Sequence, residues 1–258
     1  DVTGVQTCAL PIWCLRPHPE EQGSPPRLEE GPERLVVFAP NWLGDAVMAL
    51  PALVDVRRAS PGAVMAVAAR PAVAPLFTLV PGVSEVITTA RTAAEATGAI
   101  KAGGFDGALL FPNSFHTAWT ARSAGIRERW GFATDVRRLL LTRHAVPPVR
   151  VHQAGYYQHL TTALGFAPGP LIPRVEVSAS QREHAAAILR TAGWDGERRL
   201  VVLAAGAAYG AAKRWPAASF AAAAARLAED GCAPVLVGSP ADAPAGDEVA
   251  AALAPGVR

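Results

Sequence analysis

The chain has 258 residues, of which 50% are hydrophobic and 18% are charged, and its formal net charge is +2. This composition excludes intrinsic disorder for most of the chain, because disordered segments combine low hydrophobicity with high net charge. The scattered basic residues argue against a nucleic-acid-binding protein, and every apolar run is interrupted before the roughly 18 residues that a membrane-spanning helix needs.

The first 33 residues differ from the rest of the chain. Residues 17–33 are dense in proline, glutamate and glycine, a composition typical of disorder. The string at 2–12 resembles translated sequencing-adapter sequence, so 1–33 is predicted to be a disordered or artefactual N-terminal tail. Cys8 and Cys14 belong to this tail. With Cys232 they form no CxxC pair, so neither a disulfide framework nor a zinc site is expected.

From Arg34 onward, short apolar runs alternate with longer amphipathic segments, the pattern of parallel βαβ units. Residues 34–168 are predicted to form an N-terminal Rossmann-like domain. Its expected strands are 35–39, 63–68, 85–88 and 108–111. Its expected helices are 45–58, 72–80, 92–102, 114–124 and 152–165.

A proline-rich run at 166–174 precedes a second series of elements, and a linker is predicted at 169–179. The elements expected after it are helices at 180–192, 217–230 and 245–253 and strands at 200–204 and 234–237. Because two strands do not complete a doubly wound sheet, 180–258 is predicted to be the first part of a truncated C-terminal domain. The expected fold class is α/β, with two Rossmann-like domains of which the second is incomplete.

The segment 39–51 (APNWLGDAVMALP) lies where the first strand ends and a helix begins, which is where open α/β sheets bind ligands. Gly44 lets the backbone approach a ligand, and Asp45 directs a carboxylate from the helix N-terminus. The helix dipole favours the ionised form, which can accept a proton from a sugar hydroxyl. The alternative is that Asp45 only caps the helix. The GxGxxG spacing of dinucleotide-binding proteins is absent.

The segment 205–216 (AGAAYGAAKRWP) again joins a strand to a helix. Its glycines and the backbone N–H groups at a helix N-terminus suit phosphate oxygens, and Lys213 supplies a cation. The spacing differs from a P-loop, which needs GxxxxGK followed by Ser or Thr. The alternative is a solvated basic loop. Asn113 and Ser114 follow the strand at 108–111, and they either line a ligand cleft or form a turn and a helix N-cap.

Five strings carry a family resemblance: NWLGDAVMALP at 41–51, FPNSF at 111–115, AGIRERWGF at 124–132, RRLLLT at 137–142 and GAAYGAAKRWP at 206–216. In this order they resemble the ADP-heptose:lipopolysaccharide heptosyltransferases of glycosyltransferase family 9, most closely the heptosyltransferase II group. The resemblance runs from about Arg34 to the end of the chain. It implies a GT-B fold with an N-terminal acceptor-binding domain and a C-terminal domain that binds the nucleotide sugar.

By this resemblance the enzyme transfers L-glycero-D-manno-heptose from ADP-heptose to heptosyl-Kdo2-lipid A of the lipopolysaccharide inner core, with inversion and without a metal or other cofactor. Asp45 is then the catalytic base, and Lys213 stabilises the departing diphosphate. The implied donor contacts are Gly206, Tyr209, Gly210 and Lys213, and the implied acceptor contacts are Asn41, Gly44, Asn113 and Ser114. Candidates for binding the acceptor's carboxylates or phosphates are Arg122, Arg127, Arg129, Arg137 and Arg138.

The resemblance further implies a cytoplasmic enzyme that touches the inner face of the inner membrane through its first domain. Ala205 stands where the family has a proline, and the family's later donor motif does not occur before Arg258, so the 258-residue chain by itself is expected to be inactive. Heptosyltransferase I, or another family 9 transferase, remains an alternative. The alternative from another class is a non-catalytic nucleotide-binding Rossmann module, which would have no use for the carboxylate of Asp45.

Overall fold

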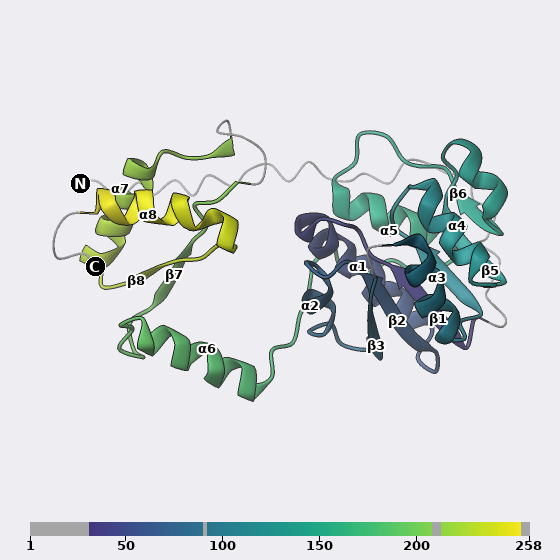
Figure 1. Cartoon of the computed structure of the whole chain (residues 1–258), viewed down its shortest axis with the longest axis horizontal. Helices are drawn as coiled ribbons and strands as arrows, with labels where there is room; N and C mark the ends of the chain where they lie inside the picture. The colour runs from purple at the N-terminus through teal and green to yellow at the C-terminus, as the bar shows by residue number, and fades with distance from the viewer. Residues whose placement is uncertain (1–30, 90–91, 208–212, 254–258) are drawn as a thin grey trace, which may run out of the picture. The chain divides into compact units, whose positions relative to one another are not determined.

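The computed structural model describes residues 31–89, 92–207 and 213–253. The chain divides into two compact units, the first ending at Glu176 and the second beginning at Val177 (Figure 1). The predicted tail lies outside the described residues except for 31–33, and Tyr209 and Gly210 lie outside them as well.

A six-stranded parallel sheet forms the centre of the first unit. Its strands are β1 (Arg34–Phe38), β2 (Val64–Ala69), β3 (Glu85–Thr88), β4 (Gly107–Leu110), β5 (Glu128–Phe132) and β6 (Arg143–Ala145). Their order is β3-β2-β1-β4-β5-β6, which is the order of doubly wound Rossmann-type sheets. The strand order therefore reverses between β1 and β4, which pair with Phe38 opposite Leu110.

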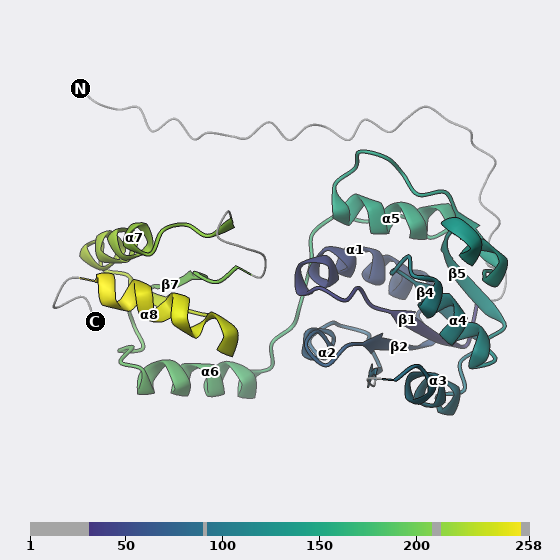
Figure 2. The same ribbon diagram turned by 45° about the horizontal axis from the view of Figure 1, so that its top comes forward.

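Helices cover both faces of this sheet (Figure 2). One face carries α1 (Leu43–Ala59), α2 (Ala74–Phe77) and α5 (Gln153–Ala163). The other carries α3 (Ala93–Ala102), α4 (Phe115–Ser123) and the 3-10 helix η1 (Asp135–Leu140). In β1, Leu35 and Val37 join the hydrophobic cluster under α1, while Val36 and Phe38 join the cluster under α4. Burial on both faces explains why this strand reads as an uninterrupted apolar run.

Two strands of the first unit, β5 and β6, were not predicted, because the last strand expected in the N-terminal domain is 108–111. β5 begins with the charged Glu128 and Arg129, and β6 has only three residues, so neither gives an apolar pattern. Pairing with neighbouring strands forms them instead: β5 pairs with β4, and β6 with β5. The helix expected at 72–80 is also shorter, because α2 covers only Ala74–Phe77.

The second unit contains α6 (Ala179–Thr191), β7 (Leu200–Leu203), α7 (Ala217–Glu229), β8 (Ala233–Leu236), the 3-10 helix η3 (Pro240–Asp242) and α8 (Ala243–Ala252). β7 and β8 pair in parallel, with Leu200 opposite Ala233. Every helix and strand predicted here is confirmed to within two residues at each end. Among the described residues, its buried apolar cluster consists of Ala205, Ala221 and Val249.

Candidate active site

The candidate residues of the first unit gather at the carboxyl ends of β1 and β4, where the strand order reverses. Asn41, Gly44 and Asp45 follow β1, and Asn113 and Ser114 follow β4. In open α/β sheets this switch point is the crevice in which ligands bind. The topology thus brings together two segments that lie about seventy residues apart in the sequence.

Asp45 is the third residue of α1, since the N-cap position is Trp42. The alternative that Asp45 serves as the N-cap is therefore wrong. The Asp45 carboxyl is half-buried on the side of α1 that approaches α5. Burial raises the pKa of Tyr157 on α5 to about 12, and the neighbouring charge of Asp45 adds to this rise, although a hydrogen bond with Gln153 opposes it. A carboxylate and a phenol that stays protonated at neutral pH thus lie close to each other.

A second cluster surrounds Asn113. Its side-chain amide donates a hydrogen bond to the Tyr156 hydroxyl at 2.6 Å. Arg137 Nη1 donates to the carbonyl of Pro112 at 2.7 Å and to Asn113 Oδ1 at 3.3 Å. These bonds fix the direction of the Asn113 amide, which stays exposed while α5 and η1 hold it.

Arg137 is the most deeply buried charged side chain of this cluster, with 1% of its surface exposed. Burial lowers the pKa of its guanidinium to about 10, partly opposed by Tyr156, and it remains protonated at neutral pH. Its Nε and Nη2 have no hydrogen-bond partner among the described residues. Gly131 is required beside it, because a Cβ there would lie 2.8 Å from Nη2.

A cavity of about 240 Å³ opens on the other side of the same strand ends. Asn41 and Ser114 line it, together with Arg70 and His116, and the N-termini of α3 and α4 contribute to its wall. Ser114 is also the N-cap of α4, where its hydroxyl accepts a hydrogen bond from the Thr117 N–H at 3.2 Å. The N-cap interpretation of Ser114 is thus confirmed, and its role in binding a ligand stays a prediction. The cavity combines hydroxyl, amide and basic groups, which suits a polar, anionic ligand.

The predicted acceptor contacts therefore divide into two groups. Asn41 and Ser114 share the cavity, whereas Asn113 belongs to the Arg137 cluster. Gly44 is exposed, and a Cβ added there would meet nothing within 4 Å, so the protein itself does not require glycine at this position. The close approach of a ligand to the backbone at Gly44 stays a prediction.

Sequence reasoning missed Arg70, His116 and Tyr156, because none of them lies in a recognisable motif. Two of the five candidate arginines are corrected by the structure. Arg137 is buried, and Arg129 is committed to backbone carbonyls, with its Nε donating to Leu140 at 2.6 Å. The exposed members of the set are Arg122, Arg127 and Arg138.

In the second unit, a hollow of about 450 Å³ lies at the carboxyl ends of β7 and β8. Gly206 lines it opposite Asp242, and a Cβ on Gly206 would lie 2.1 Å from Asp242 Oδ1, so only glycine fits. Hydrogen bonds from Ser239 hold the pKa of Asp242 below its usual range. Gly206 thus faces a carboxylate, which disfavours a phosphate at this point. Lys213 is exposed just before α7.

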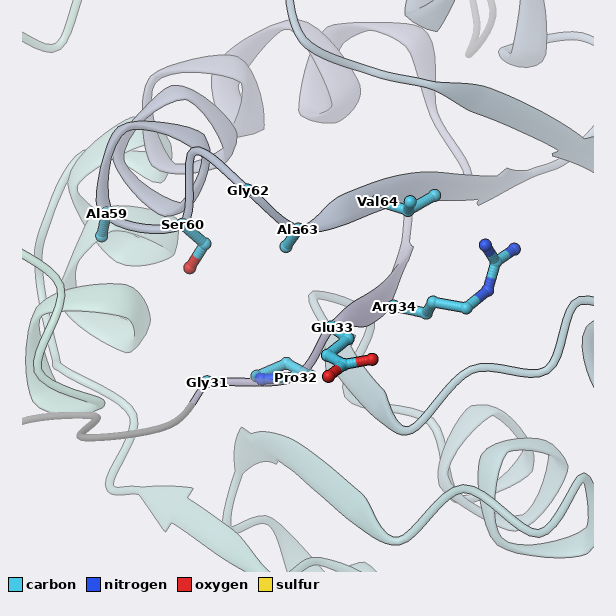
Figure 3. A pocket seen from close by; sticks show the side chains of 9 residues that line it. All are labelled: Gly31, Pro32, Glu33, Arg34, Ala59, Ser60, Gly62, Ala63 and Val64. Carbon is cyan, nitrogen blue, oxygen red and sulfur yellow. The ribbon is translucent and has the colours of Figure 1, made fainter.

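Another hollow of the first unit, of about 660 Å³, lies at the opposite ends of the strands, where β1 and β2 begin (Figure 3). Arg34 points away from Ser60 there, and its Nε donates to the Gly103 carbonyl at 3.0 Å. Ligands in doubly wound sheets bind at the carboxyl ends of the strands. We therefore assign no function to this hollow.

Within 31–89, 92–207 and 213–253, histidine, cysteine, aspartate and glutamate side chains form no group of three that could hold a metal ion. Over the same residues, each helix is too short or too polar to span a membrane.

The family model described as glycosyltransferase family 9 (heptosyltransferase) matches residues 95–258. The chain belongs to glycosyltransferase family 9. Lipopolysaccharide heptosyltransferase 2 of Escherichia coli K12 is 30% identical over 237 residues, which cover 85% of this chain and 67% of that relative. The solved structure of E. coli ADP-heptose LPS heptosyltransferase II matches with a TM-score of 0.74 at 28% identity, over 87% of this chain and 70% of the other.

A family 9 glycosyltransferase from Veillonella parvula shares the fold, with a TM-score of 0.76 at 20% identity over 86% of this chain and 66% of that one. These matches confirm the predicted α/β fold class and the resemblance to the heptosyltransferases. This family 9 protein is a glycosyltransferase, which removes the alternative of a non-catalytic nucleotide-binding module.

Proposed function

We propose that this family 9 glycosyltransferase transfers L-glycero-D-manno-heptose from ADP-heptose to the inner core of lipopolysaccharide, with heptosyl-Kdo2-lipid A as the acceptor. The names of the E. coli relatives, which refer to lipopolysaccharide and to ADP-heptose, support these substrates. The observation that carries the proposal is the position of Asp45. Its carboxylate is half-buried in the first turn of α1, at the strand switch point where doubly wound sheets bind ligands.

Asp45 is the general base in the proposed reaction. As the acceptor hydroxyl oxygen attacks the anomeric carbon of the heptose, its proton passes to the Asp45 carboxylate. The bond between the anomeric carbon and the ADP oxygen breaks in the same step, and ADP leaves with the electron pair. Because the attack comes from the side opposite ADP, the anomeric centre inverts. A positioned base of this kind typically contributes about 10²–10⁴-fold to the rate.

The departing ADP needs positive charge, and we assign this role to Lys213. Lys213 and Arg214 are both exposed at the entry to α7, and the N-terminus of α7 adds a favourable dipole. In a site that excludes water, such a cation stabilises the charge that develops on the diphosphate. Gly206, Tyr209 and Gly210 complete the proposed donor site. Because Gly206 faces the Asp242 carboxylate, we assign it to the hydroxyl groups of the donor and not to the phosphates. No metal is needed in this scheme.

Asn41, Gly44, Asn113 and Ser114 are assigned to the acceptor. The cavity lined by Asn41 and Ser114 also holds Arg70 and His116, which can meet the carboxylates of Kdo residues. Asn113 is oriented by Arg137 and Tyr156 near the proposed base. Because ADP-heptose is a soluble nucleotide sugar and the acceptor is a lipid, we propose that the enzyme works in the cytoplasm at the inner face of the inner membrane.

The test is a transfer assay on the protein expressed from its complete gene. Purified heptosyl-Kdo2-lipid A and Kdo2-lipid A are incubated separately with the enzyme and ADP-heptose, and the masses of the products are measured by mass spectrometry. We expect one heptose to be added to heptosyl-Kdo2-lipid A. Transfer to Kdo2-lipid A alone would establish the heptosyltransferase I alternative, and transfer to neither acceptor would contradict the proposal.

The same assay addresses the donor site through Lys213→Ala, with Lys101→Ala as the matched control. These are the only two lysines of the chain, and Lys101 is exposed in the last turn of α3. Lys213→Ala should weaken ADP binding about tenfold, or about 1.4 kcal/mol, in isothermal titration calorimetry, and should slow transfer. Lys101→Ala should change neither. Equal ADP affinity in both variants would make Lys213 an ordinary surface lysine.

A further inference from the structure

We propose that one outer surface of the first unit, formed by α4 and η1, docks on a membrane that contains anionic lipids. This docking face consists of Phe115, Trp119 and Arg122 on α4 and of Val136, Arg138 and Leu139 on η1. The inference deepens the proposed function, because an enzyme with a lipid acceptor must meet a bilayer. Four observations on these residues carry it.

The first observation is the outward stripe of α4. Phe115, Trp119 and Arg122 are spaced i, i+4 and i+7, so they lie on one side of the helix. Phe115 and Trp119 are 49% and 51% exposed, and their rings stack with centroids 6.1 Å apart. The opposite side of α4 buries the small residues Ala118 and Ala121 against the sheet. A helix that buries alanines and exposes two aromatic rings has its larger apolar surface on the solvent side.

The second observation is that the side chains of η1 form three rows along the helix, called edges here. In a 3-10 helix, residues three apart lie directly above one another. One edge, Arg137 and Leu140, is buried. The next edge presents Val136 and Leu139, which are 65% and 84% exposed. The last edge carries the charged Asp135 and Arg138. Leu139 is the most exposed leucine among the described residues.

The third observation is that these two elements lie together. Leu140 of η1 packs in the same buried cluster as Ala118 and Ala121 of α4. Both elements therefore cover the same face of the sheet and bury their inner edges in one cluster. α4 and η1 are in contact at the end of the sheet that holds β4, β5 and β6, where Figure 1 shows α4 beside β5 and β6, so we treat their exposed edges as one outer surface.

The fourth observation is the charge of this part of the chain. From residue 107 to residue 163 there are seven arginines, no lysines and two acids, Glu128 and Asp135, whereas the whole chain has a net charge of only +2. Arg122, Arg127, Arg138 and Arg150 are exposed. Burial lowers the pKa of Arg129, and the nearby charge of Arg122 lowers it further, although the charge of Glu128 partly opposes the shift.

Aromatic and aliphatic side chains surrounded by arginine suit a bilayer surface that contains acidic lipids. Tryptophan and leucine insert at the boundary between headgroups and acyl chains, and guanidinium groups reach the anionic headgroups. The cavity that contains Asn41 and Ser114 lies at the N-terminus of the same α4. Docking through α4 and η1 would therefore hold the proposed acceptor site near the lipid that carries the acceptor.

The test is binding to sedimented vesicles of phosphatidylethanolamine and phosphatidylglycerol, compared with phosphatidylcholine alone. The two face variants are W119S/L139S and R122Q/R138Q. The matched controls are I188S and R182Q/R190Q on α6, whose substituted positions are exposed in the second unit. Circular dichroism checks that all variants are folded.

We expect wild type to bind anionic vesicles and each face variant to bind them about tenfold more weakly, with the controls unchanged. Failure of the wild type to bind, or an equal loss in the controls, would overturn the proposal. If gel filtration showed that W119S/L139S converts a dimer to a monomer, the face would be an interface between two copies, and the proposal would again be wrong.

A second measurement separates this inference from the proposed function. Transfer of heptose to a deacylated, soluble acceptor should be the same in W119S/L139S and wild type, because neither Trp119 nor Leu139 is among the residues assigned to the acceptor or the donor. Transfer to the acceptor embedded in vesicles should fall with vesicle binding. If the protein bound vesicles but transferred heptose to neither acceptor, the proposed function alone would be contradicted. If the face variants transferred heptose to the embedded acceptor at the wild-type rate, the docking face alone would be contradicted.

Discussion

The two units are built from the same kind of apolar strand, but they bury it to different extents. In the first unit, Val36, Val67 and Leu109 on three neighbouring strands are completely buried, because helices cover both faces of the sheet. In the second unit, Val202 of β7 is 62% exposed, and α6 buries none of its described residues. Strand hydrophobicity therefore predicts that a strand exists, whereas the number of neighbouring elements determines whether the strand is buried.

The units nevertheless use one geometry for their candidate sites. In the first, the residues after β1 and β4 surround the strand switch point. In the second, the residues after β7 and β8 line a hollow at the same ends of the strands, with Gly206 against Asp242. The difference in burial follows from the number of elements: the first unit has a six-stranded sheet, whereas among the described residues the second has two strands, so less of its apolar surface is covered.

The largest expected effect in this comparison is that of Phe132→Ala in the first unit. Phe132 is fully buried and packs on Tyr156 with ring centroids 4.6 Å apart. Removing a buried phenylalanine ring leaves a cavity and should cost about 3–5 kcal/mol of unfolding free energy. Hydrogen exchange measured by mass spectrometry should show this loss of stability as faster exchange in peptides of the first unit. Leu139→Ala, at an exposed position, is the control and should stay within about 0.5 kcal/mol of wild type.

A smaller effect is expected for Val249→Ala in the second unit. Val249 is 1% exposed and packs with Ala205 and Ala221. Loss of its two methyl groups should lower the stability of this unit by about 1–2 kcal/mol. Hydrogen exchange should accelerate in α7, α8 and β7 while the first unit stays protected. If protection fell equally in both units, they would unfold together, and the comparison between a firm unit and a lightly packed one would fail.

The parts of the fold that the sequence predicted are those with a continuous apolar run or a helical apolar period, in the buried first unit and in the more exposed second unit alike. The strands β1 to β4 and the helices beside them follow from apolar runs and periodicity. β5 could not be found in this way, because its first residues, Glu128 and Arg129, are charged and its pairing with β4 depends on residues distant in sequence. η1 was missed because a short 3-10 helix has no distinctive apolar pattern.

The candidate site was predictable only where a residue follows a strand directly. Asp45, Asn41, Asn113 and Ser114 could be placed because the carboxyl ends of parallel strands meet at one edge. The neighbours that orient them come from elsewhere: Tyr156 and Tyr157 lie on α5, and Arg137 lies on η1. Burial of the Arg137 guanidinium also contradicts the usual position of an arginine at the surface, and no pattern near it signals the exception.

The central claim is that Asp45 removes the acceptor proton, and Asp45→Asn tests it most directly because it retains the shape and loses the base. Glu95→Gln is the matched control, since Glu95 is also an acid in a first turn, that of α3. In the transfer assay we expect kcat to fall at least about 10²-fold in Asp45→Asn, with ADP affinity unchanged and Glu95→Gln equal to wild type. Turnover by Asp45→Asn near the wild-type rate would contradict the account.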